Sequence, residues 1–100
     1  MRAKKAVKTY AKIYKKKDDV IYRSRASENM IIKTNYKLGE DAVFILNNTS
    51  AFIWNAINGK RDIDKISELV ARNFDVTEKE AVCDVSKVLR ELERFCLIYR

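Results

Sequence analysis

The side chains that could do chemistry in this sequence are two cysteines and several closely spaced carboxylates. Cys83 and Cys96 could ligate a metal or form a dithiol, and acid pairs such as Asp62 with Asp64 could act as general acid and base. The cysteines lie in a segment with helical periodicity, about 20 Å apart at the helical rise per residue. They cannot form a disulfide within the chain, and neither belongs to a C-x-x-C pair.

The sequence lacks the groups that usually support catalysis or metal binding near neutral pH. It has no histidine, which is the commonest general base and metal ligand. Its two glycines are too far apart for a phosphate-binding loop. The acid pairs fall on predicted helix surfaces among lysines and arginines, where solvated ion pairs are the usual explanation. We predict that the chain is not an enzyme and has no catalytic residues, cofactor or metal.

The positive charge is concentrated at the N-terminal end of the chain. The formal net charge is +7, and residues 1–19 account for eight basic and two acidic side chains, whereas residues 20–100 carry thirteen and twelve. We therefore predict a basic N-terminal extension over residues 1–19, disordered or helical, and one folded domain over residues 20–100. No apolar run approaches the length of a secretory or membrane-spanning segment, which favours a cytoplasmic location.

Short runs of β-branched and aromatic residues predict three strands, at residues 20–22, 30–32 and 42–46. Polar residues 27–29 and a loop containing Gly39 separate them, as in an antiparallel meander. Residues 43–46 of the third strand are all apolar, although alternate side chains of a strand point to opposite faces. One face can cover a core, so the other face or the free edge is left for something else, such as an added peptide strand.

Three helices are predicted after the strands. The first begins near Asn48 or Thr49, is apolar nearly all round, and ends before Gly59. The second begins at the N-cap Asp62, and the third begins with a capping box at residues 77–80 and runs to about residue 95. Strands followed by helices define a small α+β domain.

The third predicted helix has more apolar residues than one core stripe requires. We assign the core stripe to Val85, Val88 and Leu92. Val82 and Leu89 then lie to one side of it, leading on to Ser86 and Arg90, and these residues could form one wall of a groove. The alternative, that Val82 and Leu89 widen the core stripe, fits the periodicity equally well.

An ordered set of short motifs begins at the end of the third predicted strand. It comprises a strand ending in Leu46 and Asn47, a helix start of small residues, the pair Ile53 and Trp54, and Gly59 followed by basic residues. The set resembles the PqqD-like family, also called precursor-peptide (RiPP) recognition elements. The resemblance continues to the terminal Leu97 and Ile98 and covers about residues 20–99. The chain departs from the family at residues 95–96, because a glycine commonly precedes the last apolar pair.

The resemblance implies a winged helix-turn-helix-like domain, with a three-stranded antiparallel sheet followed by three helices and no catalytic activity. Such proteins bind the leader region of a ribosomally synthesised precursor peptide, which adds as an antiparallel strand beside the third strand and against the third helix. They present it to a partner such as a radical SAM enzyme, a cyclase or a leader peptidase. Carried onto this sequence, the peptide-binding residues are Val43, Phe44, Ile45, Leu46, Val82, Val85, Ser86, Leu89 and Arg90.

Two other functions are compatible with these patterns. A winged helix can bind DNA, but Lys87, Arg90 and Arg94 of the third helix are matched by acidic neighbours, which argues against nucleic acid as a partner. An unprotected edge strand can also pair with its own copy, which would make the chain a homodimer.

Overall fold

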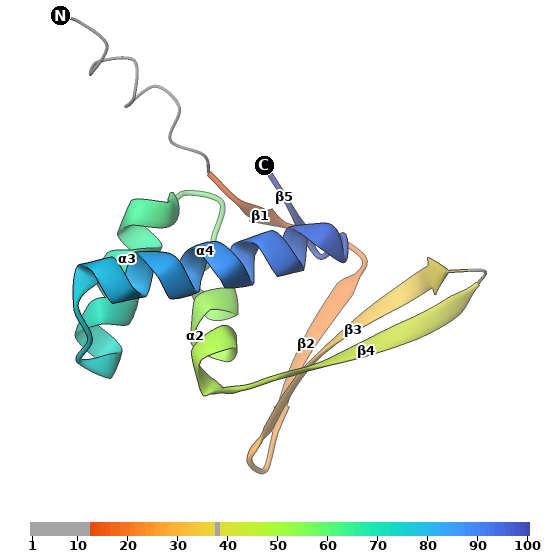
Figure 1. Ribbon diagram of the computed structural model, residues 1–100. Coiled ribbons are helices and arrows are strands. Elements are labelled where there is room, and N and C mark those ends of the chain that lie inside the picture. Colours follow the sequence, from red (N-terminus) through yellow and green to blue (C-terminus); the bar gives the residue numbers. More distant parts are fainter. Residues whose placement is uncertain (1–12, 38) are drawn as a thin grey trace, which may run out of the picture.

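The computed structural model describes residues 13–37 and 39–100, with three central strands followed by three helices (Figure 1). In chain order the elements are β1 (Lys15–Lys16), β2 (Val20–Arg25), β3 (Glu28–Lys37), β4 (Glu40–Leu46), α2 (Asn48–Ala56), α3 (Ile63–Phe74), α4 (Glu78–Arg94) and β5 (Ile98–Tyr99). This confirms the predicted α+β class and its order of a three-stranded antiparallel sheet before three helices. No helix within the described residues is long and apolar enough to cross a membrane.

The main sheet has the strand order β2-β3-β4, and its register sorts side chains onto two faces. Ile31 of β3 pairs with Tyr22 of β2 and with Phe44 of β4, and this row points toward the helices. The next row, Ile21 with Ile32 and Val43, points to the other face because successive side chains alternate. The strands are longer than predicted. The turn between β2 and β3 takes up only residues 26–27, so the residues on both sides of it belong to the strands.

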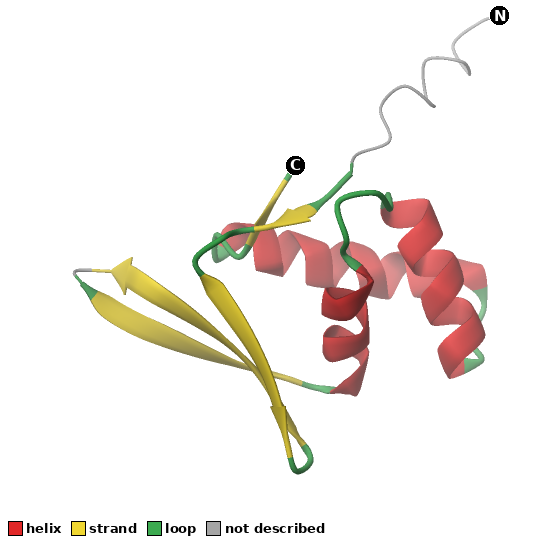
Figure 2. Cartoon of the chain, turned by 180° about the vertical axis from the view of Figure 1, so that it is seen from behind, coloured by secondary structure: helices red, strands yellow, loops and turns green. Residues whose placement is uncertain are grey.

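The core lies between the inner face of the sheet and the three helices. Its most buried large side chains, each less than 2 % exposed apart from Trp54 at 2 %, are Ile31, Ile53, Trp54, Ile57, Ile66, Leu89, Leu97 and Ile98. The helices gather to one side of the sheet, and the far end of the β3–β4 hairpin projects away from them (Figures 1 and 2). The sheet and the other helices both cover α2, which agrees with the prediction that this helix, apolar nearly all round, is buried.

The three predicted helix starts are present with their capping hydrogen bonds. The side chain of Asn47 accepts a hydrogen bond from the backbone N–H of Ser50 at 2.8 Å, and Asp62 caps α3 in the same way. The capping box of α4 is complete, since Thr77 and Glu80 each accept a bond from the other's backbone N–H. These side chains satisfy N–H groups that have no partner within a helix, which fixes where each helix begins.

Residues 13–19 belong to the folded body, which begins before the predicted boundary at residue 20. β1 pairs antiparallel with β5, and Tyr14 is a core residue that is 9 % exposed. The Nζ atom of Lys16 lies 4.9 Å from the ring centroid of Trp54, and burial lowers the pKa of this lysine. The remainder of the predicted extension, residues 1–12, lies outside the described residues.

One ion pair joins this N-terminal segment to the inner face of the sheet. Lys33 of β3 is 7 % exposed, and its Nζ atom lies 2.7 Å from both carboxylate oxygens of Asp19. The hydrogen bonds that Lys33 donates hold the pKa of Asp19 below its ordinary value. The pair lets a lysine occupy a buried position without leaving its charge unpartnered.

Helix α4 ends at the point where the sequence departs from the family pattern. Cys96 has a φ of 61°, and its N–H donates to the carbonyl of Glu93 at 3.0 Å. The N–H of Leu97 donates to the carbonyl of Leu92 at 2.9 Å, so the helix closes with a Schellman-type cap. Glycine adopts this left-handed conformation most readily, which explains why it is common at this position.

Candidate functional site

β4 is an edge strand of the main sheet. It pairs with β3 on one side, and no strand among the described residues pairs with its other edge. Half of the backbone N–H and C=O groups of an edge strand point away from its neighbour, so an extended chain can add there as a further strand. Val43 and Ile45 on the outer face are 57 % and 60 % exposed, whereas Phe44 and Leu46 on the inner face pack partly against the core.

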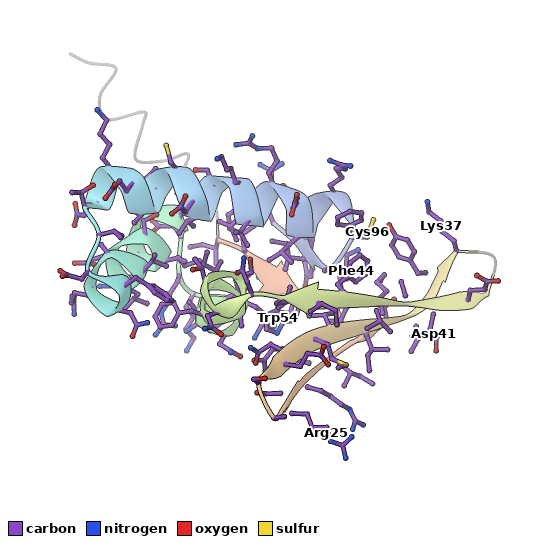
Figure 3. All side chains as sticks on the ribbon, turned by 60° about the horizontal axis from the view of Figure 1, so that its bottom comes forward. Arg25, Lys37, Asp41, Phe44, Trp54 and Cys96 are labelled. Carbon is purple, nitrogen blue, oxygen red and sulfur yellow. The ribbon has the colours of Figure 1, made fainter. Side chains whose placement is uncertain are left out.

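Aromatic side chains connect the inner face of β4 with the end of α4. The ring centroids of Phe44 and Phe95 are 5.0 Å apart, and Tyr36 of β3 packs edge-on to Phe44 at 5.8 Å. Figure 3 shows Phe44 on β4, below the end of α4 that precedes Cys96. Otherwise β4 and α4 are not among the closely packed pairs of elements. The aromatic cluster Tyr36–Phe44–Phe95 therefore forms the floor at one end of the space between strand and helix.

The other end of this space is a shallow hollow of about 270 Å³. Its lining residues come from the start of α2 and from α4, and they are Asn47, Thr49, Ser50, Asp84, Lys87 and Val88. Asp84, Val88, Glu91 and Phe95 follow one another at intervals of four, three and four residues, which places them along one flank of a helix. We use the name β4–α4 groove for the surface made up of this flank, the hollow at the start of α2 and the contact between Phe44 and Phe95.

The helix residues predicted from the sequence lie on other parts of α4. Val85 and Leu89 belong to the buried stripe of α4, at 0 % and 1 % exposure, with Ala81 and Leu92. Val82 lines a different hollow, against Asp62 and Ser67 of the α3 region.

The remaining members of the predicted helix wall also lie away from β4. Ser86 is half-buried on the same side of the helix as Val82, and Arg90 is exposed on the outer surface beside Lys87 and Arg94. The expectation that this side of α4 faces the third strand is therefore corrected. Both flanks of the helix look alike in the apolar pattern. The sequence prediction chose the flank of Val82, whereas the flank that meets β4 is the one with Asp84 and Glu91.

The four residues predicted on the third strand lie in the edge strand β4. Val43, Phe44, Ile45 and Leu46 are consecutive in β4 and lie at its free edge. Phe95 is one groove residue that sequence reasoning missed, because its position at the end of the helix gave no sign that it would meet Phe44. Which residues contact a peptide stays a prediction.

The groove offers side chains suited to binding an extended chain. No group of three or more Asp, Glu, Cys or His residues in the described part of the chain is placed to hold a metal ion. α4 carries five acidic and four basic side chains, a balance that does not favour phosphate binding. Main-chain hydrogen bonds at β4 and an apolar floor are what this surface can supply.

Comparison with known proteins points to one family. The family model described as coenzyme PQQ synthesis protein D (PqqD) matches residues 36–98. The solved structure of TbiB1 in complex with the TbiA(beta) leader peptide superposes with a TM-score of 0.71, at 19 % identity, over 86 % of this chain and 98 % of the other. Lasso peptide synthetase B1, complexed with its leader peptide, gives 0.71 at 12 % identity, over 89 % and 100 %. No functionally curated protein matches the chain.

Proposed function

Because the chain belongs to the PqqD family, we propose that it binds the leader region of a ribosomally synthesised precursor peptide and presents it to a modifying enzyme. The observation that carries this proposal is the free edge of β4, which faces a helix flank across an aromatic floor. The two similar structures, each solved with a leader peptide, support it.

Binding proceeds by strand addition at β4. Main-chain hydrogen bonds along Val43–Leu46 supply affinity, and alternate side chains of the leader enter the β4–α4 groove, where Phe44, Val88 and Phe95 select them. The strand residues Val43, Phe44, Ile45 and Leu46 are the same ones that were predicted from the sequence. On the helix, the flank with Asp84, Val88 and Glu91 replaces the predicted wall.

The role of the chain is non-catalytic in this proposal. A leader held on β4 keeps the rest of its precursor near the active site of the partner, which raises the local concentration of substrate there. The partner that does the chemistry is a radical SAM enzyme, a cyclase or a leader peptidase. No cofactor and no metal are needed by the chain for this task.

The test is a titration with a labelled synthetic peptide that copies the leader of any short reading frame beside the gene. Fluorescence anisotropy is measured at low and high salt for the wild type, Phe44→Ala and Phe52→Ala. Phe52 is a matched control, because it is also partly buried and packs edge-on against Phe74 at 5.4 Å, away from the groove. We expect salt-tolerant binding that Phe44→Ala weakens roughly tenfold and Phe52→Ala leaves unchanged.

Two rival functions are outcomes of the same experiment. Salt-stable, sequence-specific binding of duplex DNA without peptide binding would overturn the proposal, because non-specific DNA contacts weaken steeply with salt. Self-association through the edge of β4 would appear as a dimer in sedimentation that the leader peptide dissociates, since both use the same backbone groups. Equal losses in Phe44→Ala and Phe52→Ala would instead point to general destabilisation.

A further inference from the structure

The outer face of the main sheet carries two cross-strand rows of side chains that belong to no core. In the first row Ile21 of β2 pairs with Ile32 of β3, which pairs with Val43 of β4. The second row is Arg23 with Met30, which pairs with Ile45. We call these six residues the outer rows. Neighbouring side chains on one face of a sheet are in contact range, so the five apolar members form one continuous patch.

The outer rows are exposed although most of them are large and apolar. Ile21, Val43 and Ile45 are 47 %, 57 % and 60 % exposed, and Met30 and Ile32 are half-buried. None of the five belongs to the core cluster. A contiguous apolar patch of this kind on a small domain marks an interaction surface, because single exposed residues are common and grouped ones are not.

Basic side chains border the patch on the β2 side. Arg23 ends one of the rows, and Arg25 follows two residues later on the same face of β2, directly opposite Glu28 of β3. Neither arginine forms a salt bridge with any residue that the structure describes. A partner that fits here has its own apolar patch with carboxylates beside it.

The outer rows are continuous with the edge that receives the leader in the proposed function. A strand added at β4 would place every second side chain in the groove and the others on the outer face, next to Val43 and Ile45. The bound leader would thus widen the outer face by one strand. A protein covering this face would contact the chain and the leader together.

We propose that the modifying enzyme docks on the outer face of the sheet, with an apolar patch over the outer rows and a carboxylate against Arg23. This inference rests on the proposed function, since the side chains of the bound leader complete the docking surface. The enzyme therefore binds the loaded chain more tightly than the empty one, so a loaded chain displaces an unloaded one from it.

The experiment measures how tightly a purified radical SAM enzyme, cyclase or leader peptidase encoded near the gene binds the full chain, with and without the synthetic leader. Ile21→Glu places a charge in the patch, two strands away from the edge that binds the leader. Ser24→Glu is the matched control, because it adds the same charge to an exposed position on the other face of β2. Arg23→Glu is a second variant that keeps all five apolar residues.

We expect the leader to tighten enzyme binding roughly tenfold in the wild type and in Ser24→Glu. Ile21→Glu and Arg23→Glu should each weaken enzyme binding by about tenfold while their affinity for the leader stays within about twofold of the wild type. Circular dichroism confirms that the variants are folded.

Enzyme binding to Ile21→Glu at wild-type strength would overturn the inference. So would a wild-type dimer in sedimentation that Ile21→Glu dissociates, because a second copy would then occupy the face. Failure of the wild type to bind the leader would contradict the proposed function. The docking surface would then be tested by comparing enzyme binding to the wild type, Ile21→Glu and Ser24→Glu, all without leader.

Discussion

The two faces of the β2-β3-β4 sheet are built from similar residues and have opposite environments. Ile31 and Ile32 are neighbours on the same strand, yet Ile31 is 0 % exposed under the helices and Ile32 is half-buried on the uncovered face. The three helices can cover only one side of the sheet (Figure 2). An apolar residue in a strand therefore does not indicate the core by itself, and a strand apolar on both faces indicates a partner.

The largest expected effect separates these two isoleucines directly. Ile31→Ala removes a fully buried side chain and leaves a cavity, so it should lower the free energy of unfolding by about 3 kcal/mol. Ile32→Ala should cost about 1 kcal/mol, because water already reaches part of the side chain. Urea denaturation of both variants measures the difference, and equal losses would mean that the outer face is also packed in solution.

The same contrast applies to the two flanks of α4. Val88→Lys introduces a charge into the β4–α4 groove and should weaken leader binding roughly tenfold. Val82→Lys makes the same change beside α3 and should leave binding unchanged. Lysine is a good helix former and can extend its ammonium group to solvent, so both variants should fold. Peptide anisotropy measures leader binding by both variants. A loss confined to Val82→Lys would support the helix wall predicted from the sequence.

A pH series examines the ion pair between Asp19 and Lys33 on the inner face of the sheet. The carboxyl of Asp19 has a lowered pKa in the folded state, so it stabilises the fold above its unfolded pKa of about 4. This contribution is lost as the pH falls through the lower folded value. The wild type should therefore be more stable than Asp19→Asn at neutral pH, and the difference should shrink below about pH 4. Denaturation at stepped pH measures it, and a pH-independent difference would contradict the assignment to the Lys33 pair.

The smallest expected effects fall on the outer rows. Ile21→Thr and Val43→Thr keep β-branched side chains in exposed strand positions, so the free energy of unfolding should change by no more than about 0.5 kcal/mol. Thermal unfolding of the isolated chain measures this. A loss of unfolding free energy close to that of Ile31→Ala would show that the outer face is packed, and would contradict the difference between the two faces.

The fold could be predicted from sequence because its signals are local. Asn47, Asp62 and Thr77 cap their helices by hydrogen bonds within three residues, and such bonds depend little on the rest of the chain. The three strands were recognised by composition, although not at their full length. The β1–β5 pairing was missed, because Lys15 and Lys16 carry no strand signal of their own and their partner strand lies at the other end of the chain.

The candidate site was less accessible to sequence reasoning. The position of β4 at an edge follows from strand order, which a meander makes simple. The orientation of α4 about its own axis does not, because Val82 and Val88 flank the buried stripe almost symmetrically in the helical pattern. In the structure, the contact between Phe44 and Phe95 and the hollow that Asp84 and Val88 line with Asn47 show which flank meets the strand.

The exposed thiols of Cys83 on α4 and of Cys96 just beyond its end allow this part of the molecule to be labelled without new cysteines. Cys96 follows Phe95 directly, so a fluorophore on it in a Cys83→Ser background would report the arrival of a strand at the groove. The same thiols are a hazard in any sizing experiment. Without reductant they can join two chains covalently, and that product would imitate an edge-paired dimer although no strand had been added.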